Sequence, residues 1–386
     1  MRILIAGTTY YPALNGQAIF TINLAEGLAK RGHQVTVLFP EGRDAGTSRN
    51  KVQLEAVGSI SLTAVHTDTF VPVFFRKRVR CIFDAFQPEV VHIQDHYPIS
   101  KVVVDEAKKR GRKIIGTNHF SPISLTPYIP AFPGLMPFYD RSLWKWMMSV
   151  YNQLDIVIAP SRSAVDLMLK NGLKVRAHPL SCGTDLTHFH PDPSIDQKAC
   201  RLKYGLDPDK IIFLFVGRVD EEKRIEVLLQ AISYVNRDNV QLAVAGNGAV
   251  LKELTALAKK LNLGSRVRFT NYVRNEDLHS LLNSADVFTM ASEFESLSIA
   301  SLEAMSCGLP LLLANASALP DLVTPGVNGY LFKPGNAEDA ARCMEMLADC
   351  KDLRVRMGQA SVIKAQSHNL ENTLQEYEKF YESLQS

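Results

Sequence analysis

The sequence predicts an α/β protein with two doubly wound, parallel-sheet domains of the Rossmann-like kind. Short apolar runs alternate with amphipathic helical patterns from the first residue, stop in a proline-rich charged stretch, and start again beyond it. The chain has 386 residues, which exceeds the length at which one hydrophobic core usually stops growing. We therefore expect two large domains.

The first half opens with a βαβ unit. "RILIAG" is a candidate buried strand, "FTINLAEGLAKRG" a helix with Phe20, Leu24 and Leu28 on one face, and "HQVTVLF" the next strand. Further strands are predicted at "EVVHIQ", "KIIGT", "DIVIAP" and "KVRAHPL". Residues 1–188 are thus predicted to form an N-terminal domain.

The stretch "HFHPDPSIDQKACRLKYGLDPDK" has three prolines, mixed charge and no strand pattern, so residues 189–208 are predicted as an interdomain linker. A second doubly wound domain is predicted over residues 209–366. Its strands are expected at "IIFLFVG", "QLAVAG", "RVRFT", "ADVFTM" and "GLPLLLA". Residues 367–386 form a C-terminal helix by periodicity, and packing back on the N-terminal domain is one arrangement open to it.

Composition excludes several classes of protein. The net charge of +3 and the lack of a basic stripe argue against a nucleic-acid partner. Six scattered cysteines without a CxxC pair indicate reduced thiols in a cytoplasmic protein rather than a zinc or disulfide framework. The first apolar run ends at Gly7, too short for a signal-peptide core, and no later run is long enough to span a membrane.

Ligands in doubly wound sheets bind outside the carboxyl ends of the strands, so we expect a site between the two domains. The loops "GTTYYPALNGQ" and "AGNGAVL" lack the GxGxxG spacing, which disfavours a nicotinamide dehydrogenase. The chain also has no GxxxxGK[ST] motif, which argues against a P-loop nucleotidase.

Two cations follow a predicted strand in "VGRVDEEKR". Arg218 supplies planar donors and Lys223 a point charge, a combination that would neutralise a diphosphate. A solvated start to a helix, with Glu221 and Glu222 pairing the cations, explains the pattern equally well.

Two carboxylates stand in "EFESLSIASLEAM". Glu295 is predicted on a strand-to-helix loop and Glu303 about two turns into the helix. Backbone N–H groups near Leu297 and Ser298, at the helix N-terminus, would add donors for sugar hydroxyls or phosphate. Exposed carboxylates on a solvated helix are the alternative.

These motifs, in this order, resemble the GT-B glycosyltransferases of family four, which are retaining enzymes that use nucleotide sugars. The resemblance covers nearly the whole chain. It rests on "YYPALNGQ", "VVHIQDH", "IIGTNHF", "CGTDLTHFHP", "FVGRVDEEKRIEVLLQA", "AGNG", "VRFTNYV", "EFESLSIASLEAMSCGLP" and "LVTPGVNGYLF".

The resemblance implies a role for each matched residue. Arg218 and Lys223 would bind the donor diphosphate and stabilise the departing nucleotide, Glu303 would bind ribose, and Glu295 would hold the transferred sugar. Catalytic roles are implied for His119, Arg218, Lys223 and Glu295, and donor binding for Gly16, Arg218, Lys223, Val273, Glu295, Leu297, Ser298 and Glu303. A lone histidine that ends a strand is otherwise often a hydrogen-bonded structural residue, so the role of His119 rests on the resemblance.

The sequence departs from the family pattern at three places. Asn15-Gly16 replaces Gly-Gly, Ser296-Leu297-Ser298 replaces Gly-Phe-Gly, and Arg224 replaces a glycine. The second change is expected to reshape the sugar pocket. The resemblance implies no cofactor and no metal ion, because the cation pair serves the diphosphate and no DxD cluster flanks the cleft strands.

The acceptor is predicted less directly. Residues 70–83 and 127–151 mix bulky apolar side chains with Arg and Lys, as membrane-interface surfaces do, although an ordinary amphipathic helix over the core has the same pattern. "GTNHFSP" is similar to glycosyltransferases with lipid acceptors. We therefore expect a cytoplasmic, peripheral enzyme that acts on a sugar or lipid acceptor.

Three other functions fit the same architecture. They are a nucleotide-sugar epimerase, a glycogen-type phosphorylase, which needs a pyridoxal lysine and a longer chain, and a non-catalytic sugar-nucleotide-binding protein. The full set of matched residues argues against the last.

Overall fold

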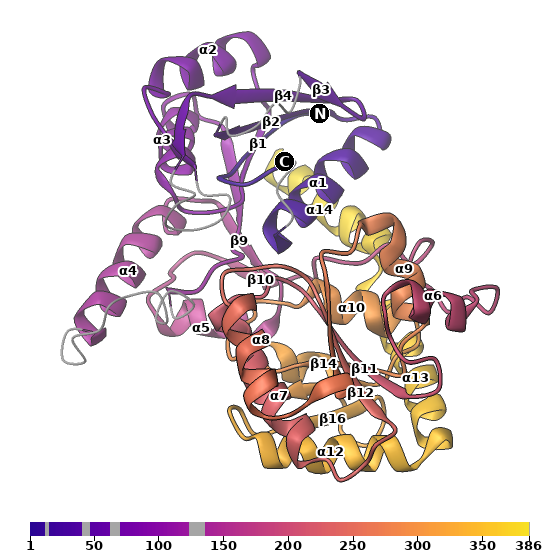
Figure 1. The fold of residues 1–386 in the computed structure, drawn as a ribbon. Helices are drawn as coiled ribbons and strands as arrows, with labels where there is room; N and C mark the ends of the chain where they lie inside the picture. Colours follow the sequence, from indigo (N-terminus) through magenta and orange to yellow (C-terminus); the bar gives the residue numbers. More distant parts are fainter. Residues whose placement is uncertain (12–14, 41–46, 62–69, 123–135, 386) are drawn as a thin grey trace. The chain divides into compact units, whose positions relative to one another are not determined.

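The computed structural model describes residues 1–11, 15–40, 47–61, 70–122 and 136–385. These residues form two compact bodies, here called unit 1 (Met1–Cys182 with Asn372–Ser386) and unit 2 (Gly183–Glu371) (Figure 1). Each unit has a parallel sheet between helices, so the predicted α/β class is confirmed.

The main sheet of unit 1 has, within the described ranges, eight strands in the order β10-β9-β8-β7-β1-β2-β4-β3. All neighbours are parallel except the edge pair β3 and β4. The strands are β1 (Arg2–Ala6), β2 (Gln34–Pro40), β3 (Ser48–Arg49), β4 (Val52–Val57), β7 (Val90–Ile93), β8 (Lys113–Thr117), β9 (Ile156–Ala159) and β10 (Ala177–Pro179). Successive crossovers run in opposite directions on either side of the β1/β7 pair, which makes this pair the switch point where such sheets bind ligands.

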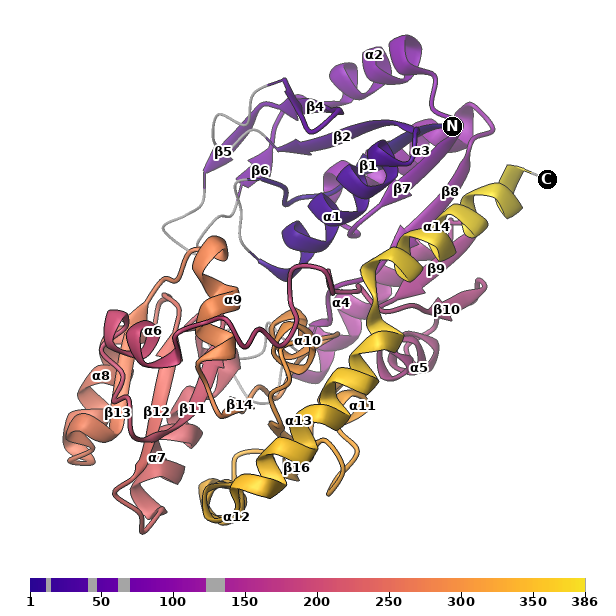
Figure 2. The same cartoon turned by 90° about the vertical axis from the view of Figure 1, so that its right-hand side faces the viewer.

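The helices of unit 1 include one from the far end of the chain. They are α1 (Gly16–Lys30), α2 (Arg76–Phe86), α3 (Pro98–Lys109), α4 (Met136–Tyr151), α5 (Arg162–Lys170) and α14 (Leu370–Gln385). Strands β5 (Ser59–Ser61) and β6 (Phe70–Pro72) form a separate antiparallel pair. Phe20, Leu24 and Leu28 are buried, as the helical period of α1 predicts. Figure 2 shows α14 running along the sheet, where Tyr377 and Tyr381 are fully buried.

The sheet of unit 2 has six described strands, all parallel, in the order β13-β12-β11-β14-β15-β16 (Figure 2). They are β11 (Ile211–Val216), β12 (Val240–Ala245), β13 (Val267–Asn271), β14 (Val287–Met290), β15 (Leu311–Ala314) and β16 (Gly329–Phe332). The helices are α6 (Gln197–Lys203), α7 (Ile225–Tyr234), α8 (Leu251–Lys260), α9 (Asn275–Asn283), α10 (Ile299–Ser306), α11 (Leu319–Leu322), α12 (Ala337–Asp349) and α13 (Lys351–Ala365). Here the switch point is the β11/β14 pair.

Residues 189–208, predicted as a linker, belong to unit 2 in the structure. Arg201 of α6 explains why, because its buried guanidinium donates to the backbone oxygens of Ser284 (2.7 Å) and Lys210 (3.0 Å) and pairs with Asp286 at 2.8 Å. A buried arginine with all these partners ties its helix to the unit that supplies them.

Within the described ranges, the structure contains no helix with the length and apolar character that a bilayer span requires.

Candidate active site

The loops after β11 and β14 meet at the switch point of unit 2. The two strands are neighbours, so their carboxyl ends open onto one edge of the sheet. There the Nζ atom of Lys223 donates to Oε1 of Glu295 at 2.8 Å, across 72 positions in the chain. The structure thus brings together the predicted diphosphate cation and the predicted sugar carboxylate.

Carboxylates surround both cations. Arg218 pairs with Asp220 and, through Nη2, with Glu222 at 2.8 Å, while Lys223 lies 3.3 Å from the same Glu222. The alternative interpretation of this segment, in which neighbouring glutamates pair with the two cations, therefore holds for Glu222. A diphosphate that enters this site has to exchange with these carboxylates.

Lys223 is held in its charged form. Burial lowers its pKa, but the carboxylates of Glu295 and Glu222 raise it by more, so the net pKa lies above the ordinary lysine value. The ammonium is therefore available as a fixed positive charge at neutral pH.

The glycines of "AGNG" pack one loop against another. Gly246 has φ +148°, and a Cβ there would lie 1.8 Å from the carbonyl oxygen of Gly217. Backbone bonds join the same loops, from the N–H of Gly217 to the oxygen of Ala245 and from the N–H of Val219 to that of Asn247. The glycines of this motif allow its loop to pack closely against the backbone that carries Arg218. This packing role does not require the GxGxxG spacing of a phosphate-binding loop.

Arg224 occupies a left-handed position, with φ +51°, between the turn 221–223 and α7. Glycine, which the family resemblance implies at this position, adopts this conformation without steric cost. The guanidinium pairs with Glu226 at 2.8 Å and lies 3.6 Å from Glu293.

Helix α10 places the second carboxylate. Ser298 is its N-cap, and its hydroxyl oxygen accepts from the backbone N–H of Ser301 at 3.2 Å. Glu303 is the fifth residue of the helix, slightly more than one turn in, so the expected two turns was too long. Glu303 keeps some solvent contact as a residue, yet burial of its carboxyl raises the pKa to about 8.

Two apolar residues on the predicted donor list also lie in unit 2. Val273 follows β13, Leu297 precedes α10, and both are partly buried against the core of the unit.

In unit 1 the predicted residues follow β1 and β8. Gly16 is the first residue of α1, and Asn15, which replaces the common glycine, is the N-cap whose side-chain oxygen accepts from the N–H of Ala18 at 2.9 Å. Residues 12–14 of the motif "YYPALNGQ" lie outside the described residues. The sequence change at Asn15 thus stabilises the start of the helix.

His119 is oriented by a residue that sequence reasoning missed. Its Nε2–H donates to Oε1 of Gln94 at 3.0 Å, so Nδ1 is the unprotonated nitrogen. Burial lowers the pKa of His119 to about 3, which keeps the ring neutral at pH 7. The amide of Gln94 in turn donates to His92 Nε2 at 3.2 Å, and His92 Nδ1 donates to the hydroxyl of Tyr381 at 2.7 Å.

Asp95 is a second residue that was missed. Its buried carboxylate accepts from the N–H and hydroxyl of Thr8, from the amide of Gln17 and from the hydroxyl of Ser100, at distances of 2.6–3.0 Å. These contacts fix the loop after β1 against α1. The signals in the sequence are that Gln94 ends a predicted strand, that Asp95 follows it directly, and that both lie in the motif "VVHIQDH".

Two family models match the chain, Glycosyltransferase Family 4 over residues 14–188 and Glycosyl transferases group 1 over residues 196–362. The chain belongs to the family four, or group 1, glycosyltransferases. It is therefore an enzyme of the glycosyltransferase class.

Relatives of this glycosyltransferase are similar over most of their length. Alpha-monoglucosyldiacylglycerol synthase of Streptococcus pneumoniae is 26% identical over 358 residues, which are 92% of this chain and 80% of the relative. A GDP-mannose-dependent alpha-mannosyltransferase of Corynebacterium glutamicum is 25% identical over 335 residues, which are 86% and 76% of the two chains.

Solved structures establish the GT-B fold of this glycosyltransferase. Sucrose-phosphate synthase of Thermosynechococcus elongatus superposes with a TM-score of 0.81 at 19% identity, covering 100% of this chain and 99% of the other. Anabaena HepE in complex with UDP-glucose gives a TM-score of 0.80 at 18% identity, covering 98% and 99%. The predicted fold class is confirmed.

Proposed function

We propose that this glycosyltransferase moves a hexose from a nucleotide-diphosphate sugar to a hydroxyl of a lipid or glycan acceptor, with retention of configuration and without a divalent metal ion. The contact between Lys223 and Glu295 carries the proposal, because it joins a cation suited to phosphate and a carboxylate suited to sugar hydroxyls. Two similar proteins, a GDP-mannose-dependent alpha-mannosyltransferase and an alpha-monoglucosyldiacylglycerol synthase, support the donor and acceptor classes.

The proposed chemistry begins with an exchange of partners. The diphosphate oxygens replace Glu222 and Glu295 around Lys223, and Asp220 and Glu222 around Arg218. Glu295, released from the ammonium, then accepts hydrogen bonds from the transferred sugar. The ion pair between Lys223 and Glu295 is thus replaced by two contacts with the nucleotide sugar, one from each residue.

The two cations then act on the departing nucleotide. The bond from the anomeric carbon to the diphosphate breaks, the acceptor oxygen bonds to that carbon on the same face, and the acceptor hydroxyl passes its proton to the departing diphosphate. Negative charge grows on the diphosphate, where preorganised cations stabilise it. Glu303 binds the ribose, and the neutral ring of His119 contacts the transferred sugar.

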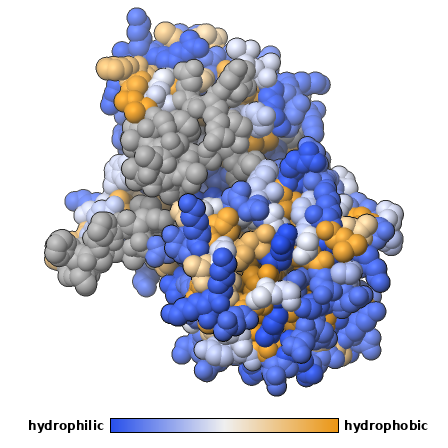
Figure 3. Space-filling model, in the orientation of Figure 1, coloured by the Kyte–Doolittle hydropathy of each residue, from blue (hydrophilic) through white to orange (hydrophobic). Residues whose placement is uncertain are grey.

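A membrane interface for unit 1 is the proposed route to a lipid acceptor. The inner face of α2 covers the core through Val79, Ile82 and Phe83. Its outer side is basic, and large apolar side chains of the unit are exposed, with Phe74 at 100% and Phe138 at 70%. Figure 3 shows hydrophobic atoms gathered at the upper left of unit 1. Residues 127–135 of the second predicted segment lie outside the described residues.

The testing experiment incubates the protein with UDP-glucose or GDP-mannose and vesicles containing diacylglycerol, with and without EDTA. Released nucleoside diphosphate and a new glycolipid are expected, in equal amounts and unaffected by EDTA. Epimerised sugar without nucleotide release would indicate the epimerase, and donor binding without turnover the non-catalytic alternative.

Variants link the activity to the site. Arg218→Ala and Lys223→Ala are expected to lower turnover at least about 100-fold, since each removes a charge-assisted contact to the leaving group. Arg224→Gly is the matched control, because it removes a neighbouring cation and leaves a residue suited to φ +51°. Near-wild-type turnover in both alanine variants would contradict the assignment.

A further inference from the structure

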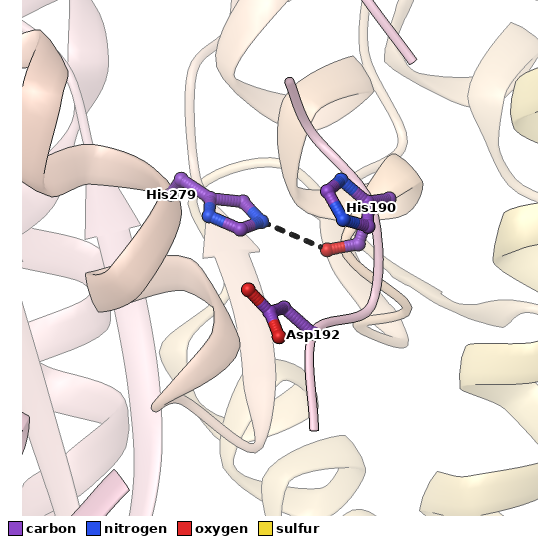
Figure 4. Close-up of side chains that lie close together, drawn as sticks. All are labelled: His190, Asp192 and His279. Carbon is purple, nitrogen blue, oxygen red and sulfur yellow. Dashed lines mark hydrogen bonds between the residues drawn. The ribbon is translucent and has the colours of Figure 1, made fainter. Parts of the chain in front are cut away.

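Three possible metal ligands lie together in unit 2, outside the predicted donor residues. They are His190 and Asp192, in the segment that precedes α6, and His279 on α9 (Figure 4). One ligand atom from each residue lies within 4.8 Å of the other two. The two histidine rings are stacked, with centroids 5.0 Å apart.

The backbone of this group is already fixed. The buried side chain of Asn283, at the end of α9, accepts from the N–H of Asp192 at 2.8 Å and donates to the carbonyl of His190 at 3.1 Å. Helix and segment are therefore held together before any ligand binds. The backbone of the two parts therefore loses little conformational freedom when a ligand binds.

The side chains have the supporting contacts that metal ligands usually have. His279 Nε2–H donates to the carbonyl of His190 at 3.0 Å, which leaves Nδ1 with its lone pair. Asp192 Oδ1 accepts from the N–H and hydroxyl of Ser194 at 2.9 and 2.6 Å, so Oδ2 is the oxygen left to coordinate. Both contacts orient the ligands and fix the tautomer of His279.

We propose that His190, Asp192 and His279 bind a divalent transition-metal ion, and that Zn²⁺ is the ion that fits best. Two imidazole nitrogens and one carboxylate oxygen suit zinc, whereas Mg²⁺ and Ca²⁺ prefer oxygen ligands alone. Zinc bonds of about 2.0–2.2 Å place tetrahedral ligand atoms roughly 3.3 Å apart. The three ligand atoms, which lie within 4.8 Å of one another without an ion, would have to approach to that spacing, with water as the fourth ligand.

The metal would join two parts of unit 2 that are far apart in sequence. It would bind the segment 190–192 to α9 directly, in addition to the bonds through Asn283. The proposed role is structural and independent of the proposed sugar transfer. Ions that bind the folded chain raise its melting temperature by mass action.

The experiment uses the full chain, stripped with EDTA and desalted, and titrates Zn²⁺ by calorimetry with melting temperatures in parallel. One saturable site and a zinc-dependent rise in melting temperature are expected, with no comparable effect of Mg²⁺. Asp192→Asn and His279→Gln should each weaken zinc binding about 10- to 100-fold or more. His178→Gln, a histidine variant in unit 1, is the matched control and should bind as wild type.

Asp192→Asn keeps an oxygen for Ser194 and is the variant least expected to disturb folding, which its melting temperature without metal checks. Wild-type zinc affinity in both Asp192→Asn and His279→Gln would show adventitious binding elsewhere and overturn the proposal. The absence of saturable zinc binding by the wild-type chain would overturn it as well.

Discussion

Glu303 and Glu295 differ in their surroundings more than their common carboxyl chemistry suggests. Glu295 is paired with an ammonium at 2.8 Å, whereas burial raises the pKa of Glu303 to about 8. Without ligand, Glu303 therefore holds a proton at pH 7. The two residues are suited to different parts of one donor.

Glu303→Gln is expected to change how stability depends on pH. Between the ordinary carboxyl value of 4.5 and about 8, folded Glu303 holds a proton that the unfolded chain has lost, so stability falls as pH rises. Glutamine does not titrate, so the variant should be more stable than wild type at pH 8 and nearly equal at pH 4.5. Urea unfolding of both proteins across this range measures the difference, and a constant difference would contradict the burial argument.

Substitutions of Glu303 and Glu295 should have different effects in binding experiments. Glu303→Gln is expected to weaken binding of free nucleoside diphosphate roughly 10- to 150-fold, the effect of the charge-assisted hydrogen bond of about 1.5–3 kcal/mol that Glu303 makes once ribose binding displaces its proton. Glu295→Gln should lower turnover by a similar factor while nucleoside diphosphate, which lacks the sugar, binds nearly as before. Calorimetry with nucleoside diphosphate decides this, and equal weakening in both variants would disprove the division of roles.

Gln94 is expected to act through His119. Gln94→Leu removes the acceptor that fixes the Nε2–H tautomer, so turnover should fall about tenfold or more while nucleoside diphosphate binding stays unchanged. Nitrogen NMR of the His119 ring should show mixed tautomers in the variant. His92 provides a control, because Thr117 still contacts its Nε2 at 2.8 Å and its ring should keep its tautomer. An unchanged His119 ring would remove the positioning role.

Gln94 and Asp95, the residues that sequence reasoning missed, act through side-chain contacts between different elements of the chain. Arg218, Lys223 and Glu295 stand next to strong strand and helix patterns, so their proximity follows from the order of parallel strands. Asp95 depends on Thr8 and Gln17, 87 and 78 positions away, and a side-chain contact of that kind has no periodic signal.

At the scale of elements, most long periodic segments were predictable, whereas several strands at or near the sheet edges were not. The predicted strand "RILIAG" and the helix that follows it correspond to β1 and α1. Strands β4 and β16 were not predicted, because β16 has four residues with a partly exposed centre and β4 lies near the sheet edge. Such strands are defined by their neighbours more than by their own pattern.

Gly246→Ala tests the loop contact that supports Arg218. The new Cβ would lie 1.8 Å from the carbonyl oxygen of Gly217, so both loops must shift and stability should fall by more than the backbone cost alone. Gly264→Ala is the control, since Gly264 also has positive φ, +51°, but no atom within 4 Å of the added Cβ. The control should lose about 1 kcal/mol. Equal losses, measured by urea unfolding, would contradict the packing argument.

At the scale of the whole molecule, unit 1 needs both ends of the chain. Leu374, Tyr377 and Tyr381 of α14 are buried in it, and the side chain of Leu374 occupies the space beside Gly27 of α1. Tyr377 bonds Thr117 at 2.9 Å, and Tyr381 bonds His92. The sequence predicted this helix, but its packing in unit 1 was only one of the arrangements that the sequence allowed.

Ending the chain at Glu371 should therefore unfold unit 1 and leave unit 2 folded. Three large buried side chains are lost, at about 2–5 kcal/mol each, against a typical domain stability of about 5–15 kcal/mol. Ending the chain at Tyr381 keeps all three and should leave unit 1 folded. Hydrogen exchange resolved by peptide compares the units, and protected unit 1 amides in the shorter chain would contradict the prediction.

The return of α14 also sets an order of events during synthesis. The ribosome completes residues 1–182 long before it adds Asn372. While unit 2 is translated, the surfaces of nascent unit 1 that later bury Tyr377 and Tyr381 therefore stay uncovered. Unit 2, contiguous in the chain, has its whole sequence available first. The half of the enzyme that is translated first is therefore finished last, and during that interval a chaperone would find its apolar surface on unit 1.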